Sequence, residues 1–574
     1  MKLIEALEIL RAAPKADAPS CKFFLASGFT PLHLTTFLAA ELQQRLPTQM
    51  VRIETGTFGD VAGSLEGLET RGHTGVAVAM EWPDLDPRLG ARRLGARGGD
   101  PVELLEASRS ALARLEKRLA TIAGTLPVAI SLPSLPPLPL SPVPGWQASA
   151  LELGLSTSLA RFAEGLAQAG ARVVSAQRLA QLSPMADRAA LQSDLLAAFP
   201  YTRSHASELA SLLAQILVPP LPLKGLITDL DGTLWSGILG EDGVAGVAWD
   251  LDHHAQRHGL YQQLLRNLAD NGVLIAAATK NDAGLVAEAL ARNDLLLSAD
   301  RLYPVEANWG AKSASVGRIL QAWNVGGDSV AFIDDSAMER AEVAAAHPGL
   351  LCLPFPERDD ASLLAFLERL RDLFGKPRVL DEDRLRRESL RAARIVREAT
   401  ADPAEASDRF LEQAEAHLEL SFAADPGDGR ALELVNKTNQ FNLNGRRFSE
   451  AAWREALARP GAFLLTAAYA DKYGPLGRIA VLEGMRDGGG VHLEVFVLSC
   501  RAFSRRIEYR LLERLLARFE AQEIAFDFVL TPRNGPVRNF LAGLLGRAPE
   551  PPVWLRREDV LAKCPPLYHE VQES

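Results

Sequence analysis

The feature that most constrains this chain is an apolar stretch that runs directly into a pair of aspartates. Residues 225–228 read GLIT, and residues 229–233 continue as DLDGT. Such a short apolar run predicts a strand that is buried on both faces of a parallel sheet. Reactive groups of an open parallel sheet lie just beyond the carboxyl ends of its strands, so we expect Asp229 to lie at a functional edge.

Further apolar runs alternate with helical stretches, as expected for α/β domains. The central runs lie at 225–229, 273–278, 329–333 and 350–353, and the earlier runs lie at 23–26, 75–80, 127–132 and 171–175. A later region has predicted strands at 463–468, 478–482, 492–498 and 526–530 and predicted helices at 504–520 and 537–545. The pattern predicts three separate α/β regions.

A chain of 574 residues is too long for one hydrophobic core, since a domain takes about 150 residues. The sequence PPLP at 219–222 marks one boundary, and the charged stretch at 381–418 predicts a solvated connecting helix or helix pair. We therefore predict an α/β domain at 1–220, a Rossmannoid parallel sheet at 221–376, a helical linker at 377–417 and a third α/β domain at 418–574.

The overall composition excludes several classes of function. The formal net charge of −10 argues against a general nucleic-acid binder, because a phosphate backbone needs a basic surface. The four cysteines show no CxxC spacing, which excludes a zinc ribbon and indicates a reduced setting. No apolar run approaches the ~20 residues that span a bilayer, and residues 1–10 do not resemble a signal peptide. We expect a cytoplasmic protein with no membrane or nucleic-acid partner.

The aspartates match the needs of phosphoryl transfer. A carboxylate such as Asp229 becomes an effective nucleophile only when a metal neutralises the phosphate that it approaches. Asp231 lies past the strand end, so its side chain can act as acid and then base while its main-chain carbonyl joins a magnesium shell. The pair Asp334 and Asp335 ends another apolar run. The sequence predicts a Mg²⁺ site formed by these four residues.

Two further groups complete the predicted site. Thr279 closes an apolar run and offers a hydroxyl donor to a phosphoryl oxygen, and Lys312 supplies a positive charge for the developing charge on the phosphoryl group. Taken singly, each group has an ordinary structural role, because a strand-ending aspartate often caps a helix and a lone lysine is usually solvated. Their joint order, with three at strand ends, favours an active site.

The sequence around these residues resembles the haloacid dehalogenase (HAD) superfamily and, more narrowly, the FkbH-like glyceryl transferase/phosphatases. The matching stretches are DGTLWSG at 231–237, TKN at 279–281, NWG at 308–310, FIDDS at 332–336, NKTNQFNL at 436–443 and LSCR at 498–501. In that family 1,3-bisphosphoglycerate is dephosphorylated, and its glyceryl group moves to the phosphopantetheine thiol of an acyl carrier protein for polyketide biosynthesis. The resemblance implies Mg²⁺ as cofactor and an aspartyl phosphate on Asp229.

The spacing between the first two motifs has its own implication. The segment between Asp229 and Thr279 is too short for a large cap domain. An uncapped site suits a substrate that is carried on, or delivered to, another protein.

The third region is similar to the GNAT acyltransferases, but it lacks the glycine-rich loop that cradles the pyrophosphate of coenzyme A. Residues 501–506 read RAFSRR instead, and arginines suit the acidic surface of a carrier protein or a substrate phosphate. The resemblance makes Cys500 the candidate carrier of a transient glyceryl thioester, with a thiol pKa lowered by nearby arginines. The alternative is a packed strand-end cysteine. Carrier-protein or substrate contacts are expected at Asn436, Lys437, Asn439, Gln440, Asn442, Arg501, Arg505 and Arg506.

The first region resembles an SGNH-hydrolase-like domain, with Ser27 and His205 as the corresponding catalytic pair. The usual Gly-Asp-Ser wording is absent, however, and no DxxH sequence precedes the end of the region. We therefore predict a scaffold or docking role for residues 1–220, and hydrolase activity is the alternative.

Three functions remain in competition. The first is an enzyme that forms glyceryl-carrier protein. The second is a HAD-type phosphatase of small metabolites with a separate carrier-binding or acyltransferase module. The third makes the C-terminal region a docking module without chemistry of its own. Cys500 with its arginines favours the first function, and the missing cap favours a macromolecular acceptor.

Overall fold

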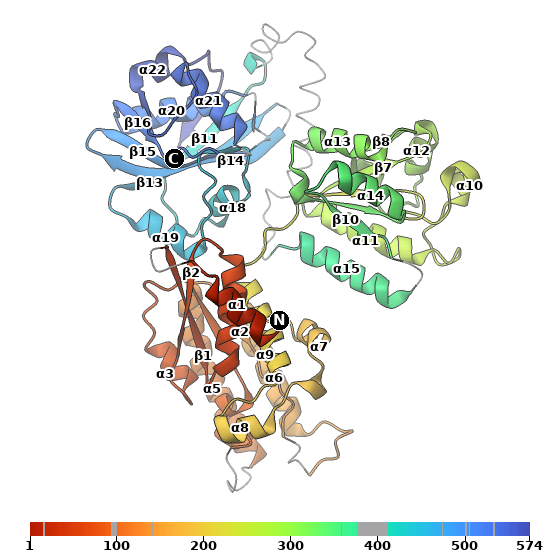
Figure 1. Cartoon of the computed structure of the whole chain (residues 1–574), viewed down its shortest axis with the longest axis vertical. Helices are drawn as coiled ribbons and strands as arrows, with labels where there is room; N and C mark the ends of the chain where they lie inside the picture. Colours follow the sequence, from red (N-terminus) through yellow and green to blue (C-terminus); the bar gives the residue numbers. More distant parts are fainter. Residues whose placement is uncertain are drawn as a thin grey trace. The chain divides into compact units, whose positions relative to one another are not determined.

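The computed structural model describes residues 1–14, 18–92, 100–138, 142–356, 359–376, 411–472, 474–499, 502–503, 505–531 and 534–574 (Figure 1). The chain forms two compact units. The first unit comprises Met1–Pro220 and Phe448–Ala456, and the second comprises Leu221–Arg447 and Leu457–Ser574. The segment Phe448–Ala456, assigned to the third domain from the sequence, thus belongs to the first unit.

The first unit is built on a five-stranded parallel sheet in the order β2-β1-β3-β4-β5. Its strands are β1 (Ser20–Ser27), β2 (Met50–Thr55), β3 (Gly75–Ala79), β4 (Val128–Ser131) and β5 (Arg172–Val173). Its helices are α1 (Leu3–Arg11), α2 (Leu32–Arg45), α3 (Val61–Glu66), α4 (Trp82–Leu85), α5 (Pro101–Ala123), α6 (Ala150–Gln168), α7 (Ala176–Leu182), α8 (Leu191–Ala197) and α9 (Arg203–Leu217). α19 (Glu450–Ala458) contributes most of its residues to this unit as well.

Both faces of this sheet are covered, and strand β1 shows how. Successive side chains of a strand point to opposite faces. Accordingly, Phe23 and Leu25 pack into one core with side chains of α2 and α9, whereas Phe24 and Ala26 pack into a second core with side chains of α5 and α6. The apolar run at residues 23–26 of β1 therefore reflects burial on two sides.

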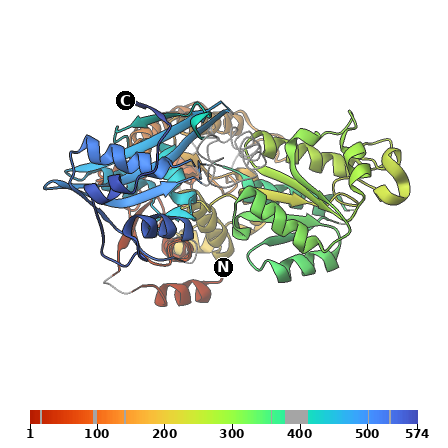
Figure 2. The ribbon, with the colours of Figure 1, turned by 90° about the horizontal axis from the view of Figure 1, so that it is seen from above.

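The second unit begins with another parallel sheet, in the order β10-β9-β6-β7-β8, with helices on both faces (Figures 1 and 2). Its strands are β6 (Gly225–Thr228), β7 (Leu274–Thr279), β8 (Leu302–Ala307), β9 (Val330–Asp334) and β10 (Leu351–Pro354). Its helices are α10 (Leu239–Gly246), α11 (Gln256–Asp270), α12 (Ala283–Leu290), α13 (Lys312–Trp323), α14 (Ala337–Ala346) and α15 (Asp360–Phe374). The central position of β6 puts the predicted nucleophile in the middle of the carboxyl edge.

The C-terminal sheet is mixed and follows the order β17-β16-β15-β14-β13-β11-β18, with β12 paired to β15. Its strands are β11 (His417–Ser421), β12 (Phe441–Asn442), β13 (Ala462–Asp471), β14 (Gly474–Asp487), β15 (Gly490–Leu498), β16 (Glu523–Phe526), β17 (Val553–Arg556) and β18 (Glu570–Glu573). Its helices are α18 (Gly429–Lys437), α20 (Ile507–Arg518), α21 (Gly535–Leu545) and α22 (Arg557–Ala562). Residues 377–410 of the predicted linker lie outside the described residues.

The strand predicted at 526–530 is wrong in position, since β16 ends at Phe526. β16 pairs in parallel with β15 only as far as Leu493. Beyond that point β12 pairs with β15 instead, because Phe441 stands opposite Leu498. The edge of β15 is therefore occupied, and the apolar residues that follow Phe526 leave the sheet.

Candidate active site

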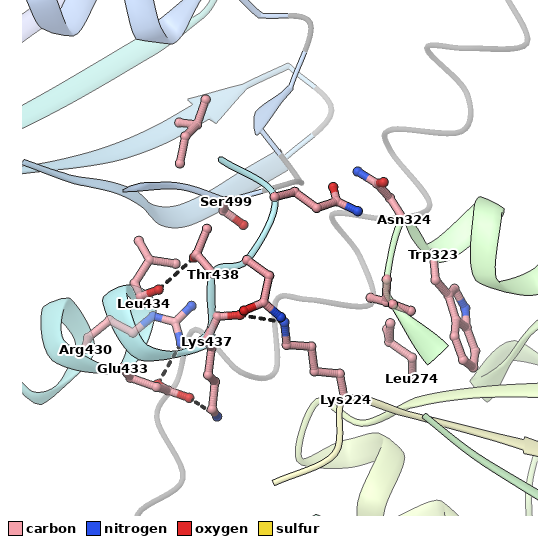
Figure 3. A pocket seen from close by; sticks show the side chains of 15 residues that line it. Lys224, Leu274, Trp323, Asn324, Arg430, Glu433, Leu434, Lys437, Thr438 and Ser499 are labelled. Atoms are coloured by element: carbon pink, nitrogen blue, oxygen red, sulfur yellow. Dashed lines mark hydrogen bonds and ion pairs between the residues drawn. The ribbon is translucent and has the colours of Figure 1, made fainter. Parts of the chain in front are cut away.

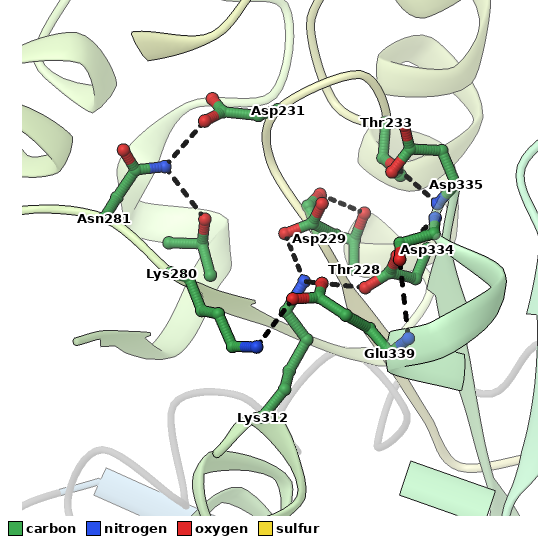
Figure 4. Close-up of polar contacts among 12 residues, drawn as sticks. Thr228, Asp229, Asp231, Thr233, Lys280, Asn281, Lys312, Asp334, Asp335 and Glu339 are labelled. Atoms are coloured by element: carbon green, nitrogen blue, oxygen red, sulfur yellow. Dashed lines mark hydrogen bonds and ion pairs between the residues drawn. The ribbon is translucent and has the colours of Figure 1, made fainter. Parts of the chain in front are cut away.

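Three predicted residues meet at the carboxyl edge of the central parallel sheet (Figure 4). Asp229 follows β6, Asp334 ends β9, and Lys312 opens α13. The Lys312 Nζ lies 2.9 Å from an Asp229 carboxylate oxygen and 2.6 Å from an Asp334 carboxylate oxygen. None of the three is more than 5% exposed. Parallel pairing of β6 with β9 thus brings together residues that lie far apart in the sequence.

A fourth group, Glu339, was not predicted from the sequence. Its carboxylate also pairs with Lys312, and its second oxygen lies 2.9 Å from the Nζ of Lys280. Glu339 lies in the first turn of α14, where acidic residues are common because they favour the positive end of a helix. In the sequence alone, Glu339 therefore cannot be told apart from an acidic residue that only stabilises the start of a helix.

The charges at this centre do not balance. Burial raises the pKa of Asp229 and the pKa of Asp334 above their usual values, although Lys312 opposes this effect. Burial would lower the pKa of Lys312, but Asp229 and Asp334 raise it. Three carboxylates face one buried ammonium, and Lys280 adds a second, half-buried ammonium beside Glu339. A further cation would offset the remaining negative charge.

The donor set fits a hard divalent cation. Asp229, Asp334 and Glu339 each place a carboxylate oxygen within 4.8 Å of the others. Magnesium prefers such oxygen ligands. The structure brings together two of the predicted metal ligands, Asp229 and Asp334, and adds Glu339 to them. The other two predicted ligands, Asp231 and Asp335, lie in the loops that follow β6 and β9.

The turn after β6 depends on Gly232. Its φ of +67° lies in the left-handed region, which is unfavourable for residues with a Cβ atom. A Cβ atom at this position would also lie 2.5 Å from a carboxylate oxygen of Asp335. Gly232 therefore allows the loop that carries Asp231 to pass close to the end of β9.

The Asp231 carboxylate accepts three N–H donors. Its Oδ1 accepts the indole N–H of Trp235 at 2.8 Å and the backbone N–H of Leu239 at 3.1 Å. Its Oδ2 accepts the side-chain amide of Asn281 at 2.9 Å. Asn281 donates as well to the Thr279 hydroxyl oxygen at 3.0 Å. The predicted acid/base and the predicted phosphate-binding hydroxyl therefore share one partner.

Five of the predicted site residues line an open cavity of about 990 Å³. Asp229, Asp231, Thr279, Lys312 and Asp335, all predicted from the sequence, contribute to its wall. Between β6 and β7 the structure contains only the two helices α10 and α11. The expectation of a site without a large cap domain agrees with this arrangement.

The predicted pair in the first unit does not form. The Ser27 hydroxyl donates to the backbone carbonyl of Phe29 at 2.9 Å. The ring of His205 is fully buried and contacts the hydroxyls of Ser134 and Ser183 at 2.8 and 2.9 Å. Burial lowers the pKa of His205 to about 3, so the ring is neutral. Ser27 and His205 therefore serve the fold here, and the hydrolase alternative loses its catalytic pair.

The predicted contact residues at 436–442 have partners within the chain. The side chain of Asn442 donates to the Thr438 carbonyl at 3.0 Å and accepts the backbone N–H of Gly445 at 2.8 Å. Asn439 accepts from Arg447. Asn436 and Gln440 are half-buried in the same stretch. These contacts order the loop between α18 and β12.

Cys500 and Arg501 lie outside the described residues. Arg505 is only 6% exposed, and its guanidinium lies 3.5 Å from the Asp471 carboxylate and over the Tyr469 ring. Arg506 donates to the Pro566 carbonyl at 3.0 Å. Arg505 therefore stabilises the C-terminal fold. The sequence had led us to expect it as a contact for a carrier protein or substrate.

Lys437 belongs to an ion cluster on α18 (Figure 3). It pairs with Glu433, and Arg430 donates to the same carboxylate at 2.8 Å. Burial alone would raise the pKa of Glu433, but Lys437 and Arg430 outweigh it and lower the pKa to about 2. The folded state thus prefers the ionised carboxylate.

This cluster predicts an acid-labile helix. A depressed carboxyl pKa contributes stability that is complete above the unfolded-state value and is lost as the pH falls through the folded-state value. We expect Glu433→Gln to lower the free energy of unfolding by about 3 kcal/mol at pH 7. As the pH falls from about 5 to 2, the variant should lose less stability than the wild type. Hydrogen exchange of the α18 amides measures this. Parallel pH profiles for the two proteins would contradict the assignment.

Comparisons with known proteins provide independent information about the fold. No protein-family model matches the sequence. No curated protein matches it either. Among solved structures, the N-terminal part of the protein BF1531 from Bacteroides fragilis, which contains a phosphatase domain and was crystallised with Mg, matches with a TM-score of 0.52 and 19% identity. The match covers 66% of this chain and 100% of that chain.

The two proteins share a fold. Because 66% of this chain is more than the central sheet alone, the likeness extends beyond that sheet. An uncharacterized protein from Corynebacterium glutamicum is 19% identical over 27% of this chain and 98% of its own, but its TM-score of 0.20 is too low to support a common fold. The parallel sheet predicted for residues 221–376 is present in the structure as β6 to β10. Among the described residues, no helix has the length and apolar character needed to cross a membrane.

Proposed function

We propose that this protein is a cytoplasmic, Mg²⁺-dependent phosphatase and glyceryl transferase of the FkbH-like type. It takes 1,3-bisphosphoglycerate and loads the glyceryl group onto the phosphopantetheine thiol of an acyl carrier protein. The observation that carries the proposal is the meeting of Asp229, Asp334 and Lys312 beside an open cavity that Asp229 and Lys312 line. The sequence motifs around them supply the substrate class.

Asp229, Asp334 and Glu339 would hold Mg²⁺, together with Asp335 and the main-chain carbonyl of Asp231. The bound ion would neutralise phosphate charge and so allow a carboxylate to approach phosphorus. The fold likeness to a phosphatase-domain protein crystallised with Mg supports this assignment.

The side chains have distinct roles in phosphate removal. At the phosphate ester of the substrate, an Asp229 oxygen forms a bond to phosphorus while the bond between phosphorus and the glyceryl oxygen breaks. Asp231 gives the leaving alcohol a proton. Thr279 and Lys312 hold the phosphoryl oxygens. Water then attacks the aspartyl phosphate, its proton passes to Asp231, and phosphate leaves.

The acyl phosphate at the other end of the substrate has a different fate. A thiolate attacks the acyl carbon, the carbon–sulfur bond forms, and the bond to the phosphate oxygen breaks. No further energy input is needed, because an acyl phosphate is already activated. The uncapped cavity supports a substrate that must reach a second macromolecule.

Intact-mass spectrometry of a phosphopantetheinylated carrier protein tests the proposal. After incubation with 1,3-bisphosphoglycerate, Mg²⁺ and the enzyme, the carrier should gain one dephosphorylated glyceryl group. A carrier that gains a phosphoglyceryl group would show that transfer occurs without removal of phosphate at Asp229. An unmodified carrier, with phosphate still released, would favour the second candidate below.

The second candidate is a phosphatase of small metabolites with a separate carrier-binding or acyltransferase module. It is favoured by one observation, namely that the wall of the 990 Å³ cavity comes entirely from the central parallel-sheet part of the chain. It predicts Mg²⁺-dependent phosphate release from small phosphate esters at a rate that a carrier protein does not change.

The role of Cys500 gives a separate prediction. If Cys500 carries the glyceryl group, Cys500→Ala should reduce carrier loading at least ~100-fold while phosphate release through Asp229 stays within about twofold. Cys564→Ala is the matched control. Carrier loading and inorganic phosphate are measured in the same reaction. Normal loading by Cys500→Ala would mean direct transfer from the acyl phosphate to the carrier thiol.

A further inference from the structure

Asn281 uses both hydrogens of one amide group within the active site (Figure 4). Its Nδ2 donates to the Asp231 Oδ2 at 2.9 Å and to the Thr279 Oγ1 at 3.0 Å. The residue is only 2% exposed. A carboxylate can only accept hydrogen bonds, so the nitrogen of the amide must face Asp231.

The other two donors to Asp231 differ from Asn281 in their origin. Trp235 and Leu239 both lie in the segment that directly follows Asp231 in the chain. They orient the carboxylate relative to its own loop. Asn281 lies two residues beyond the end of β7, so its bond is the one of these three that ties the Asp231 loop to the segment after the neighbouring strand.

The bond to Thr279 has a second consequence. Since the Thr279 oxygen accepts the amide hydrogen, its own hydroxyl hydrogen remains to be donated. A phosphoryl oxygen at this strand end is the acceptor that the proposed chemistry supplies. Asn281 therefore orients the phosphate-binding hydroxyl and the acid/base at once.

We propose that Asn281 is a positioning residue that sets Asp231 for attack of water on the aspartyl phosphate. In that step the water oxygen bonds to phosphorus, the bond from phosphorus to the Asp229 oxygen breaks, and the water proton passes to Asp231. This inference rests on the proposed function of Asp229 and Asp231. A displacement of about 1 Å can cost on the order of 100-fold in rate, because proton transfer requires hydrogen-bond reach.

The first step has a different requirement. When the leaving group is p-nitrophenolate, it needs no proton, so formation of the aspartyl phosphate depends little on the orientation of Asp231. Loss of the Asn281 bond to Thr279 affects both steps, whereas loss of its bond to Asp231 affects only hydrolysis. Hydrolysis of the phosphoenzyme should therefore slow much more than its formation.

Rapid mixing of the full-length protein with p-nitrophenyl phosphate and Mg²⁺ tests this prediction. For Asn281→Leu we expect a steady-state kcat that is roughly 10- to 100-fold lower, preceded by a burst of about one p-nitrophenolate per enzyme. Acid quenching should trap phosphate on the protein. Asn267→Leu makes the same change on the exposed face of α11 and should behave as wild type.

The outcomes separate the two proposals. If the wild type turns the substrate over through a phosphoenzyme and Asn281→Leu matches it, or loses formation and hydrolysis equally, the role of Asn281 is refuted. If the wild type forms no phosphoenzyme at all, the proposed function fails and this inference fails with it. Should Asn281→Leu not fold, Asn281→Ser, which keeps a single shorter donor, replaces it and must show the same burst.

Discussion

Replacing Asp229 with asparagine should reduce phosphate release by at least ~10⁴-fold, because an amide oxygen does not attack phosphorus. The fold should survive the change. Asp229 belongs to a buried group of three carboxylates around Lys312, so the substitution removes one negative charge where negative charge is in excess. Thermal unfolding should therefore occur at the same temperature as in the wild type or slightly above it.

Release of inorganic phosphate in the presence of Mg²⁺ measures the effect. Asp372→Asn, which makes the same change at an exposed position of α15, should retain full activity. Turnover by Asp229→Asn near the wild-type rate would refute the assignment of Asp229 as the nucleophile. If Asp229→Asn is instead inactive because it unfolds, the expectation that the fold tolerates the loss of this negative charge is wrong.

The second large effect is expected for Lys312→Met. Methionine is one atom shorter than lysine and equally unbranched, but it leaves Asp229, Asp334 and Glu339 without the Lys312 ammonium at their centre. Removing one partner from a buried ion pair typically costs 3–5 kcal/mol, so we expect the central parallel-sheet part to lose about that much stability. Phosphate release should fall by roughly 10³-fold, because the developing phosphoryl charge loses its cation.

Magnesium gives this prediction a sharper form. If the three carboxylates are metal ligands, Mg²⁺ should raise the unfolding temperature of Lys312→Met more than that of the wild type, because a bound cation restores part of the missing charge. Lys117→Met, on the exposed side of α5, is the control. Equal Mg²⁺ shifts in the two proteins would mean that the carboxylates do not hold the ion.

The strands that sequence reasoning located are those with continuous apolar residues. β6, β7 and β9 are buried along their length, and each was predicted within one residue of its observed ends. The edge strands β5 and β10 were located from their apolar runs, whereas the edge strands β2 and β8 were missed because polar residues or proline interrupt their apolar residues. Hydrophobic patterning alone does not distinguish such edge strands from loops.

The candidate site shows a similar division. Asp229, Thr279 and Asp334 were predicted because strand ends of a parallel sheet share one edge. In the structure Asp229, Thr279 and Lys312 line one cavity, and Asp334 pairs with Lys312. Glu339 was missed because an acidic residue in a first helical turn has an ordinary explanation. The predicted pair of Ser27 and His205 does not form, because a resemblance in sequence between two short stretches says nothing about the distance between their side chains.

The turn at Gly232 separates what can vary in this protein from what cannot. With a φ of +67° and the Asp335 carboxylate where a Cβ atom would lie, any other residue at this position strains the turn or displaces Asp335. On the wall of the same cavity, by contrast, Ile238 and Leu260 are 48% and 43% exposed. Substitutions there cost little stability. The turn that carries Asp231 therefore has little room for substitution, whereas this part of the cavity wall can be changed without disturbing the catalytic loop.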